Sequence, residues 1–294
     1  IVLIESTTNR IKVYRWHLRE VKGEDPLEFA SVQLVPLAHD AKPELRDYAV
    51  GDFDGNGLAD LLVTDPASAR MTLIRCEKGK GMLPPESFPS FQETCGALAV
   101  SCGGPPRTVA FLLSRKEELL GVSHYDAATG RMTYPQPLDV AGSPQCIALR
   151  PRAEQAPEGV ICLLGLKGSG EKKQQRFELA LIEPAEGGWH VTSRQEAPGL
   201  DAAPERLVSL DVNGDGRTDL LALRAYETAV LLVQNAEGKF ENVSGAPEFR
   251  KHLLGKLTAS AVTSAALQKG EAPLIVLCQE GMVRMMAYQA GNLV

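Results

Sequence analysis

The sequence predicts an all-β fold, a β-propeller assembled from four-stranded units. The chain has 294 residues, of which 44% are apolar, so it can build a sizeable core. Short apolar runs alternate with turns rich in Gly, Pro, Asp and Asn, and no helical period is visible. One strand-turn-strand pattern recurs along the chain, which is typical of a repeat fold.

The repeat is clearest when the chain is aligned on an acidic turn that begins at Asp52. An apolar strand at 61–64 follows this turn, and a second strand at 71–76 follows a short polar connection. The opening residues 1–16 match residues 61–76 without a gap. Further copies of the two-strand pattern begin at residues 109, 160, 220 and 274. A short strand before each turn and an extended piece after each pair give four strands per unit.

These copies predict a single domain, 1–294, with six units. The turns that correspond to Asp52 begin at Cys102, Arg150, Asp211 and Ser264. The expected units are 1–35 (partial), 36–94, 95–141, 142–199, 200–249 and 250–294 (partial). The first unit lacks its opening strand and the last stops as its fourth begins. Either the two ends close together into a ring, or flanking sequence completes it.

The second strand of most units is a near-continuous apolar run rather than an alternating one. LLVT, AFLL, ICLL and IVLC are the clearest examples. Such runs indicate strands covered on both faces, as expected when each unit stacks between two neighbours.

Six cysteines are present, without a CxxC pair or a zinc-like Cys/His spacing. Cys162 and Cys278 lie within apolar runs, where we expect buried free thiols. Cys95 and Cys102 are a candidate disulfide pair.

The charge and hydropathy patterns exclude two classes of partner. A net charge of −6 without a basic cluster argues against nucleic acid. No apolar segment reaches the length of about 18 residues needed for direct membrane insertion. The chain opens on IVLIE, without Met or a basic leader region, and reads as a piece of a longer protein.

Two acidic turns carry the strongest chemical signal. Both place oxygen-bearing side chains at turn positions 1, 3, 5 and 9, and glycines at positions 4 and 6. Position 7 can offer a backbone carbonyl. The candidate metal ligands are Asp52, Asp54, Asn56, Leu58 and Asp60 in the first turn, and Asp211, Asn213, Asp215, Arg217 and Asp219 in the second. Such an all-oxygen cage suits Ca²⁺, which takes six to eight oxygen ligands, better than Mg²⁺.

An EF-hand begins in the same way but requires a bidentate Glu at position 12 and a helix on each side. Position 12 is Val63 in the first turn and Ala222 in the second, and a β-rich run follows each. The two turns therefore close early, with Asp60 and Asp219 as their last ligands. We expect the cation mainly to stabilise the turn, because three adjacent carboxylates repel one another.

The segments DFDGNGLADLLV and DVNGDGRTDLLA resemble the calcium loops of FG-GAP or VCBS repeats, the blades of integrin-α-like β-propellers. The resemblance covers residues 45–80 and 203–243 and is architectural elsewhere. It implies that each loop joins the first two strands of a blade. Because integrin-like propellers have seven blades, it allows a seventh unit in the parent protein.

The other units depart from this loop pattern. They read SCGGPPRT from Ser101, LRPRAEQAPEG from Leu149 and TSAALQKGEA from Thr263. None of these can form the oxygen cage, so we expect two Ca²⁺ ions rather than one per blade.

The sequence contains no motif of a known catalytic centre, such as GxSxG, HExxH, a P-loop or GxGxxG. We therefore predict no catalytic residue. The predicted function is a calcium-stabilised binding or interaction scaffold outside the cytoplasm, where calcium fills weak sites. Its ligand would be a protein or a carbohydrate. The alternative is a carbohydrate-active enzyme, similar to polysaccharide lyases with these repeats, or a sugar-binding module.

Overall fold

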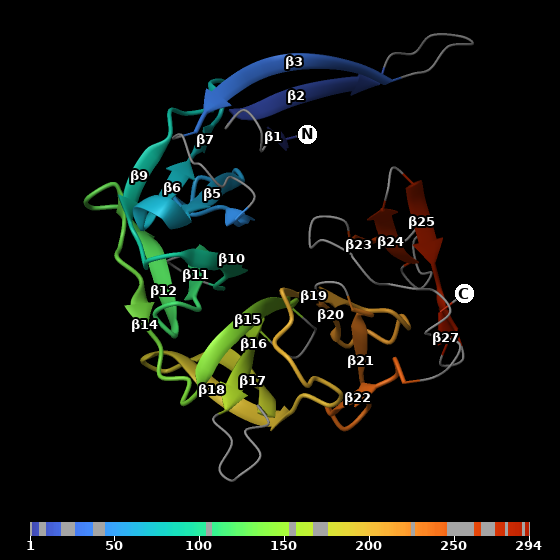
Figure 1. The fold of residues 1–294 in the computed structure, drawn as a ribbon. Coiled ribbons are helices and arrows are strands. Elements are labelled where there is room, and N and C mark those ends of the chain that lie inside the picture. The colour runs from blue at the N-terminus through green and yellow to red at the C-terminus, as the bar shows by residue number, and fades with distance from the viewer. Residues whose placement is uncertain are drawn as a thin grey trace. The chain divides into compact units, whose positions relative to one another are not determined.

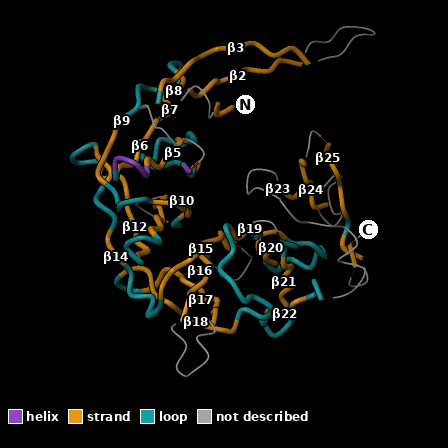
Figure 2. The backbone as a smooth tube through the Cα atoms, viewed as in Figure 1, coloured by secondary structure: helices purple, strands orange, loops and turns teal. Residues whose placement is uncertain are grey.

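The prediction of an all-β fold is confirmed by a computed structural model of the chain (Figure 1). The structure describes residues 2–5, 10–18, 27–37, 45–103, 108–152, 157–166, 176–224, 227–245, 262–265, 274–279, 282–289 and 292–293. Parts of the three loops that lack the oxygen cage, at 104–107, 153–156 and 266–273, lie outside the described residues. Strands account for nearly all regular structure in the described residues, and one short 3₁₀ turn, η2 (Pro66–Ser68), interrupts them (Figure 2). Within these ranges, no helix has the length and hydropathy needed to cross a membrane.

The chain divides into two compact units, Ile1–Pro137 and Leu138–Val294. All sheets in both units are antiparallel, and their strands follow one another in chain order apart from small excursions. The predicted boundaries of the six repeats stay a prediction.

The first unit contains three main sheets. The first comprises β1 (Val2–Glu5), β2 (Arg10–Leu18) and β3 (Leu27–Pro36). The second comprises β4 (Tyr48–Gly51), β5 (Asp60–Asp65), β6 (Arg70–Ile74) and β9 (Glu86–Pro89), with a small ribbon of β7 (Cys76–Glu77) and β8 (Gly81–Met82). The third comprises β10 (Thr94–Ser101), β11 (Thr108–Ser114), β12 (Leu119–Asp126) and β13 (Arg131–Met132), and β14 (Gln136–Pro137) also pairs with β12.

The second unit also contains three main sheets. The first comprises β15 (Ser143–Arg150), β16 (Gly159–Leu166), β17 (Arg176–Ala185) and β18 (Gly188–Glu196). The second comprises β19 (Arg206–Leu210), β20 (Asp219–Leu223), β21 (Val230–Gln234) and β22 (Phe240–Asn242). The third comprises β23 (Val262–Ala265), β24 (Leu274–Gln279) and β25 (Met282–Met286), and a separate pair is formed by β26 (Tyr288–Gln289) and β27 (Asn292–Leu293).

The second strands of the two middle sheets are buried on both faces, as the apolar runs predict. In β5, Leu61 and Val63 pack against apolar side chains of β2 and β3. Leu62 packs on the opposite face, against the β10–β13 sheet. In β20, Leu220 packs toward the β15–β18 sheet, and Leu221 packs toward the β23–β25 sheet. Successive side chains of a strand point to opposite faces, so each middle sheet is the apolar centre of its unit.

The prediction that Cys278 is a buried thiol is wrong. Ile275 and Leu277 of β24 are buried against the middle sheet, whereas Cys278, one residue later, is exposed. The β24 run is therefore covered on one face only at this position. Cys162 is fully buried as expected, and burial raises the pKa of its thiol. The candidate disulfide between Cys95 and Cys102 is not formed, since both are free thiols.

Candidate metal centre

Each acidic turn connects the first two strands of a four-stranded sheet. The first lies between β4 and β5, where Gly51 pairs with Asp60. The second lies between β19 and β20, where Leu210 pairs with Asp219. Position 9 of each turn is thus also the first residue of a buried strand.

Short-range hydrogen bonds shape the first turn. Asp52 Oδ2 accepts the backbone N–H of Gly57 at 2.9 Å, and Asp54 Oδ1 accepts that of Asn56 at 3.1 Å. Asn56 Oδ1 in turn accepts the N–H of Leu58 at 2.8 Å. Gly57 has a φ of 85°, a left-handed backbone conformation that residues other than glycine rarely adopt.

Asp60 anchors the turn to the rest of its sheet. Its side chain is buried, and Oδ2 accepts the N–H of Phe53 at 3.0 Å. Oδ1 accepts the N–H of Cys76, which begins β7 two residues after the third strand ends, at 2.8 Å. Burial raises the pKa of Asp60, and the nearby charge of Asp54 adds to this, while the backbone hydrogen bonds oppose it.

Three carboxylates converge in the first turn. One oxygen from each of Asp52, Asp54 and Asp60 lies within 4.8 Å of the other two, and this is the one such cluster among the described residues. Asp52 Oδ1 is buried and has no hydrogen-bond partner. Arg75 Nη1 lies 3.7 Å from Asp54 Oδ2, but Nη2 of the same side chain binds Glu86 at 2.7 Å. The donor set fits a hard cation, which would satisfy the orphaned oxygen and offset the repulsion between the carboxylates.

Asn56 and Leu58, the other candidate ligands of the first turn, are placed differently. The Asn56 amide nitrogen donates to Asp54 Oδ2 at 3.1 Å and to the carbonyl of Cys76 at 2.9 Å. Its oxygen is bound to the N–H of Leu58. The structure therefore brings together the three aspartates of the predicted set, and the amide group faces them with its nitrogen.

The second turn repeats the anchor. Asp219 is fully buried, its Oδ2 accepts the N–H of Val212 at 2.9 Å, and its Oδ1 accepts that of Gln234 at 2.8 Å. Burial raises the pKa of Asp219 to about 6, with further upward contributions from Asp215 and Asp211.

In the second turn, a cationic side chain bridges Asp215 and the third strand. The Arg217 guanidinium donates to Asp215 Oδ2 through Nη2 and to the carbonyl of Gln234 through Nε. The Asn213 amide nitrogen donates to the same Asp215 oxygen at 2.7 Å. Asp211 is occupied by three backbone donors, from residues 214–216. Arg217 therefore supplies positive charge where Leu58 of the first turn supplies none.

Sequence reasoning missed the residues that complete each site from the third strand. Cys76 and Gln234 each donate a backbone N–H to the position 9 carboxylate. Since the contact uses the backbone, no side-chain type marks it. The only sequence signal for Arg75 is that a basic residue follows the third strand of the first acidic turn's sheet.

Comparisons with known proteins show a likeness of fold. No protein-family model matches the chain, and no curated protein sequence matches it. A solved structure from Bacteroides fragilis, provisionally named a 6-phosphogluconolactonase, has 9% identity and a TM-score of 0.52, covering 100% of this chain and 81% of its own. A second, from Bacteroides uniformis and provisionally named in the same way, has 12% identity and a TM-score of 0.51, covering 97% and 79%. At such identities the likeness concerns the fold alone.

Proposed function

We propose that the chain is a β-propeller module in which the sheets are blades and the acidic turns bind Ca²⁺. Three features support the propeller arrangement. The sheets are antiparallel with strands in chain order, the second strand of each middle sheet is buried on both faces, and the fold likeness extends over the whole chain. The module acts as a binding or interaction scaffold outside the cytoplasm.

The observation that carries the metal proposal is the orphaned Oδ1 of Asp52, buried beside the carboxylates of Asp54 and Asp60. A buried polar oxygen without a partner costs about 1–3 kcal/mol. Clustered carboxylates add repulsion to that cost. A divalent cation relieves both, with the Leu58 carbonyl and water available to complete its shell.

The proposed location follows from the strength of such a site. A turn with few charged ligands and an exposed outer side binds calcium weakly, in the range of extracellular modules. Calcium near millimolar concentration fills such a site outside the cytoplasm, whereas cytosolic calcium does not. The scaffold would then gain stability where it is used.

Thermal unfolding with excess Ca²⁺, excess Mg²⁺ or a chelator tests the metal proposal. Ca²⁺ at 100 times the Kd of the first turn should stabilise the fold through that turn by about 2.7 kcal/mol, a rise in Tm of roughly 5–10 °C. Asp52→Asn should remove most of this rise. Asp126→Asn is the matched control, because Asp126 caps an unrelated turn through Ala128 and Thr129. An unchanged Tm on chelation would refute the proposal.

A second candidate function concerns sugar derivatives, because two proteins of similar fold carry the name of an enzyme acting on a phosphorylated sugar lactone. A carbohydrate-active enzyme or sugar-binding module is the corresponding alternative for this chain. Hydrolysis of 6-phosphogluconolactone and binding to a glycan array test it. Turnover above the spontaneous rate would favour the enzyme, whereas glycan binding without turnover would favour the module.

A further inference from the structure

A cavity of about 710 Å³ lies in the first unit, at the opposite end of β5 from the acidic turn. The acidic turn ends at Asp60, where β5 begins, whereas the cavity is lined by η2, which directly follows β5. The side chains of its lining that matter most are Leu45, Pro66, Ala67, Glu93, Arg115 and Lys116. The lining is drawn from three connections, β5–β6, β9–β10 and β11–β12, together with Cys95 at the start of β10 and the stretch before β4. The volume is within the usual range of small-molecule sites, about 300–1,000 Å³.

The cavity has an apolar wall and a cationic wall. Leu45, Pro66 and Ala67 provide the apolar wall, and Leu45 is 53% exposed although it is a large hydrophobic residue. Arg115 and Lys116, adjacent in the β11–β12 turn, provide the cationic wall. This combination suits a ligand with an apolar body and an anionic group.

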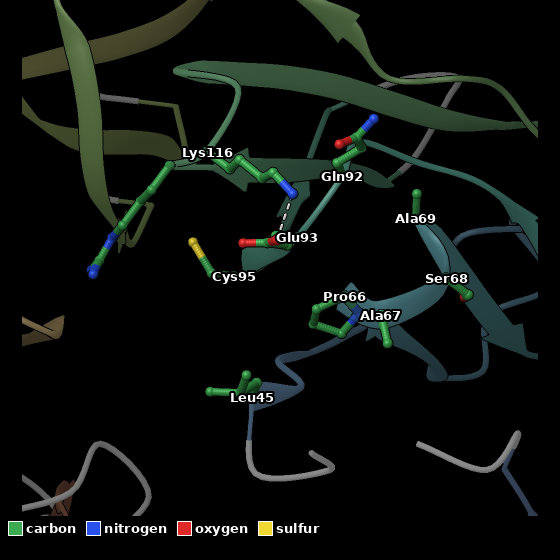
Figure 3. A pocket seen from close by; sticks show the side chains of 10 residues that line it. Leu45, Pro66, Ala67, Ser68, Ala69, Gln92, Glu93, Cys95 and Lys116 are labelled. Carbon is green, nitrogen blue, oxygen red and sulfur yellow. Dashed lines mark hydrogen bonds and ion pairs between the residues drawn. The ribbon is translucent and has the colours of Figure 1, made fainter. Parts of the chain in front are cut away.

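Among the described residues, Glu93 is the one acidic residue of the lining, and it forms an ion pair with the Lys116 ammonium. Lys116 Nζ lies 2.6 Å from Glu93 Oε1, and the two side chains are 51% and 60% exposed. Figure 3 shows the Lys116 side chain reaching Glu93, with Cys95 among the side chains that line the same cavity. An ion pair this exposed contributes little, about 0–1 kcal/mol, so another anion can replace the Glu93 carboxylate at small cost.

The turns around the cavity contain residues other than glycine with positive φ angles. Four described residues other than glycine have positive φ, and two of them, Ala69 at 53° and Glu93 at 47°, line the cavity. A third, Glu118 at 53°, lies two residues after Lys116. Such conformations cost of order 1–3 kcal/mol each and cluster at ligand-binding sites.

Partly buried and exposed hydrogen bonds join two of these turns to each other. Ser114 Oγ donates to the carbonyl of Gln92 at 2.6 Å and accepts the N–H of Glu117 at 3.1 Å. The Glu117 carboxylate accepts the N–H of Gln92 at 3.0 Å. The β9–β10 and β11–β12 connections are thus joined on both sides of the cationic turn, which preorganises the wall for a ligand.

We propose that this cavity binds a small organic anion, a carboxylate or phosphate monoester with an apolar body. The anionic group displaces the Glu93 carboxylate from Lys116 and lies against Arg115. The apolar body packs on Leu45, Pro66 and Ala67. The site is formed within the first unit and depends neither on a bound cation nor on ring closure.

Protection of Cys95 from alkylation tests the proposal. Intact protein is treated with iodoacetamide, and the modification rates of Cys95 and Cys278 are measured by peptide mass spectrometry. Both thiols are exposed, and Cys278 lies in the other unit, so it reports the reagent alone. Phenyl phosphate, benzoate and 6-phosphogluconate are the anionic probes, benzyl alcohol is the neutral probe, and inorganic phosphate lacks the apolar body.

At least one organic anion should slow Cys95 alkylation with a saturable dependence and leave Cys278 unchanged. Lys116→Gln should weaken the protecting probe roughly tenfold, and Glu93→Gln should strengthen it severalfold. Lys80→Gln is the matched control, because Lys80 forms an exposed pair with Glu77 on another turn. Repeating the assay in chelator separates this site from the calcium proposal.

Three results would overturn the proposal. The first is the absence of Cys95 protection by all three organic anions. The second is equal protection by benzyl alcohol and benzoate, which would remove the role of charge. The third is equal protection by inorganic phosphate and phenyl phosphate, which would remove the role of the apolar wall.

Discussion

Asp60 Oδ1 accepts the backbone N–H of Cys76 at 2.8 Å, which ties the acidic turn to the end of the third strand. The equivalent carboxylate of the other middle sheet, Asp219, holds Gln234 at the same distance. Position 9 of each turn is therefore a structural anchor whether or not a cation is present. In the first turn, Asp52 and Asp54 accept backbone N–H groups of the turn itself, and Asp54 reaches the third strand only through the Arg75 guanidinium at 3.7 Å. This difference separates the folding role of the turn from the metal-binding role that we propose for it.

Asp60→Ala should destabilise the protein in calcium and in chelator alike. The change leaves the buried N–H groups of Phe53 and Cys76 without their acceptor, at a cost of about 2–4 kcal/mol. Asp54→Ala should destabilise the protein in calcium but have a much smaller effect in chelator. Urea unfolding of both variants under both conditions measures the difference. Identical behaviour of the two variants would contradict the division of roles.

Arg217→Leu should raise the calcium affinity of the second turn by about five- to tenfold. The Arg217 guanidinium binds the Asp215 carboxylate and neutralises part of its charge. The substitution removes this cation and places Leu at position 7, as in the first turn. Calcium titration in an Asp52→Asn background isolates the second turn. The reverse change, Leu58→Arg, should weaken the first turn in an Asp211→Asn background. Equal affinity of the Arg217→Leu variant and its parent would show that the guanidinium does not compete with the cation.

Asp47 joins two sheets of the first unit, and Asp47→Ala should cost about 1–3 kcal/mol of unfolding free energy. Its Oδ2 accepts the N–H of Ala97 in β10 at 2.9 Å, while Oδ1 accepts that of Tyr48 at 3.0 Å. Urea denaturation measures the loss. Asp139→Ala is the control, because Asp139 accepts a hydrogen bond only two residues away, from Ala141, on an exposed turn. A loss no larger than that of the control would show that the link between sheets is unimportant.

The strands and the carboxylate cluster of the first acidic turn could be predicted because both depend on local sequence. The run Leu61–Val63 indicates double burial through its composition, and the spacing of Asp52, Asp54 and Asp60 indicates convergence through turn geometry. Cys278 was misjudged because composition does not reveal whether a neighbouring sheet covers the second face of β24.

The bond between Asp60 and Cys76 and the cavity beside Lys116 could not be predicted. The first depends on the register that brings a backbone N–H 16 residues away to the carboxylate. The second needs three connections from different parts of the chain to meet, and its positive-φ residues, Ala69 and Glu93, do not have the sequence signature of glycine. Both are consequences of strand pairing and packing.

Glu183 gives the second unit a pH dependence that a single substitution can isolate. Burial raises the pKa of Glu183, but hydrogen bonds from Thr192 and Arg150, each 2.6 Å long, together with the Arg150 charge, outweigh it and lower the pKa below 4.5. A carboxyl group whose pKa is lower in the folded state stabilises the fold above its unfolded pKa. That contribution is lost as the pH falls through the folded pKa.

Glu183→Gln should therefore lower the free energy of unfolding by about 1–3 kcal/mol at pH 7, and by progressively less below pH 4. Urea unfolding at pH 7 and at acid pH, in chelator to exclude effects of calcium, measures this. Glu237→Gln serves as the control, because the Glu237 side chain is 73% exposed and pairs with an exposed Lys239, so its loss should be small at both pH values. If the Glu183→Gln deficit stayed constant between the two pH values, the ionised carboxylate would not be its source, and lost packing around Arg150 would explain it instead.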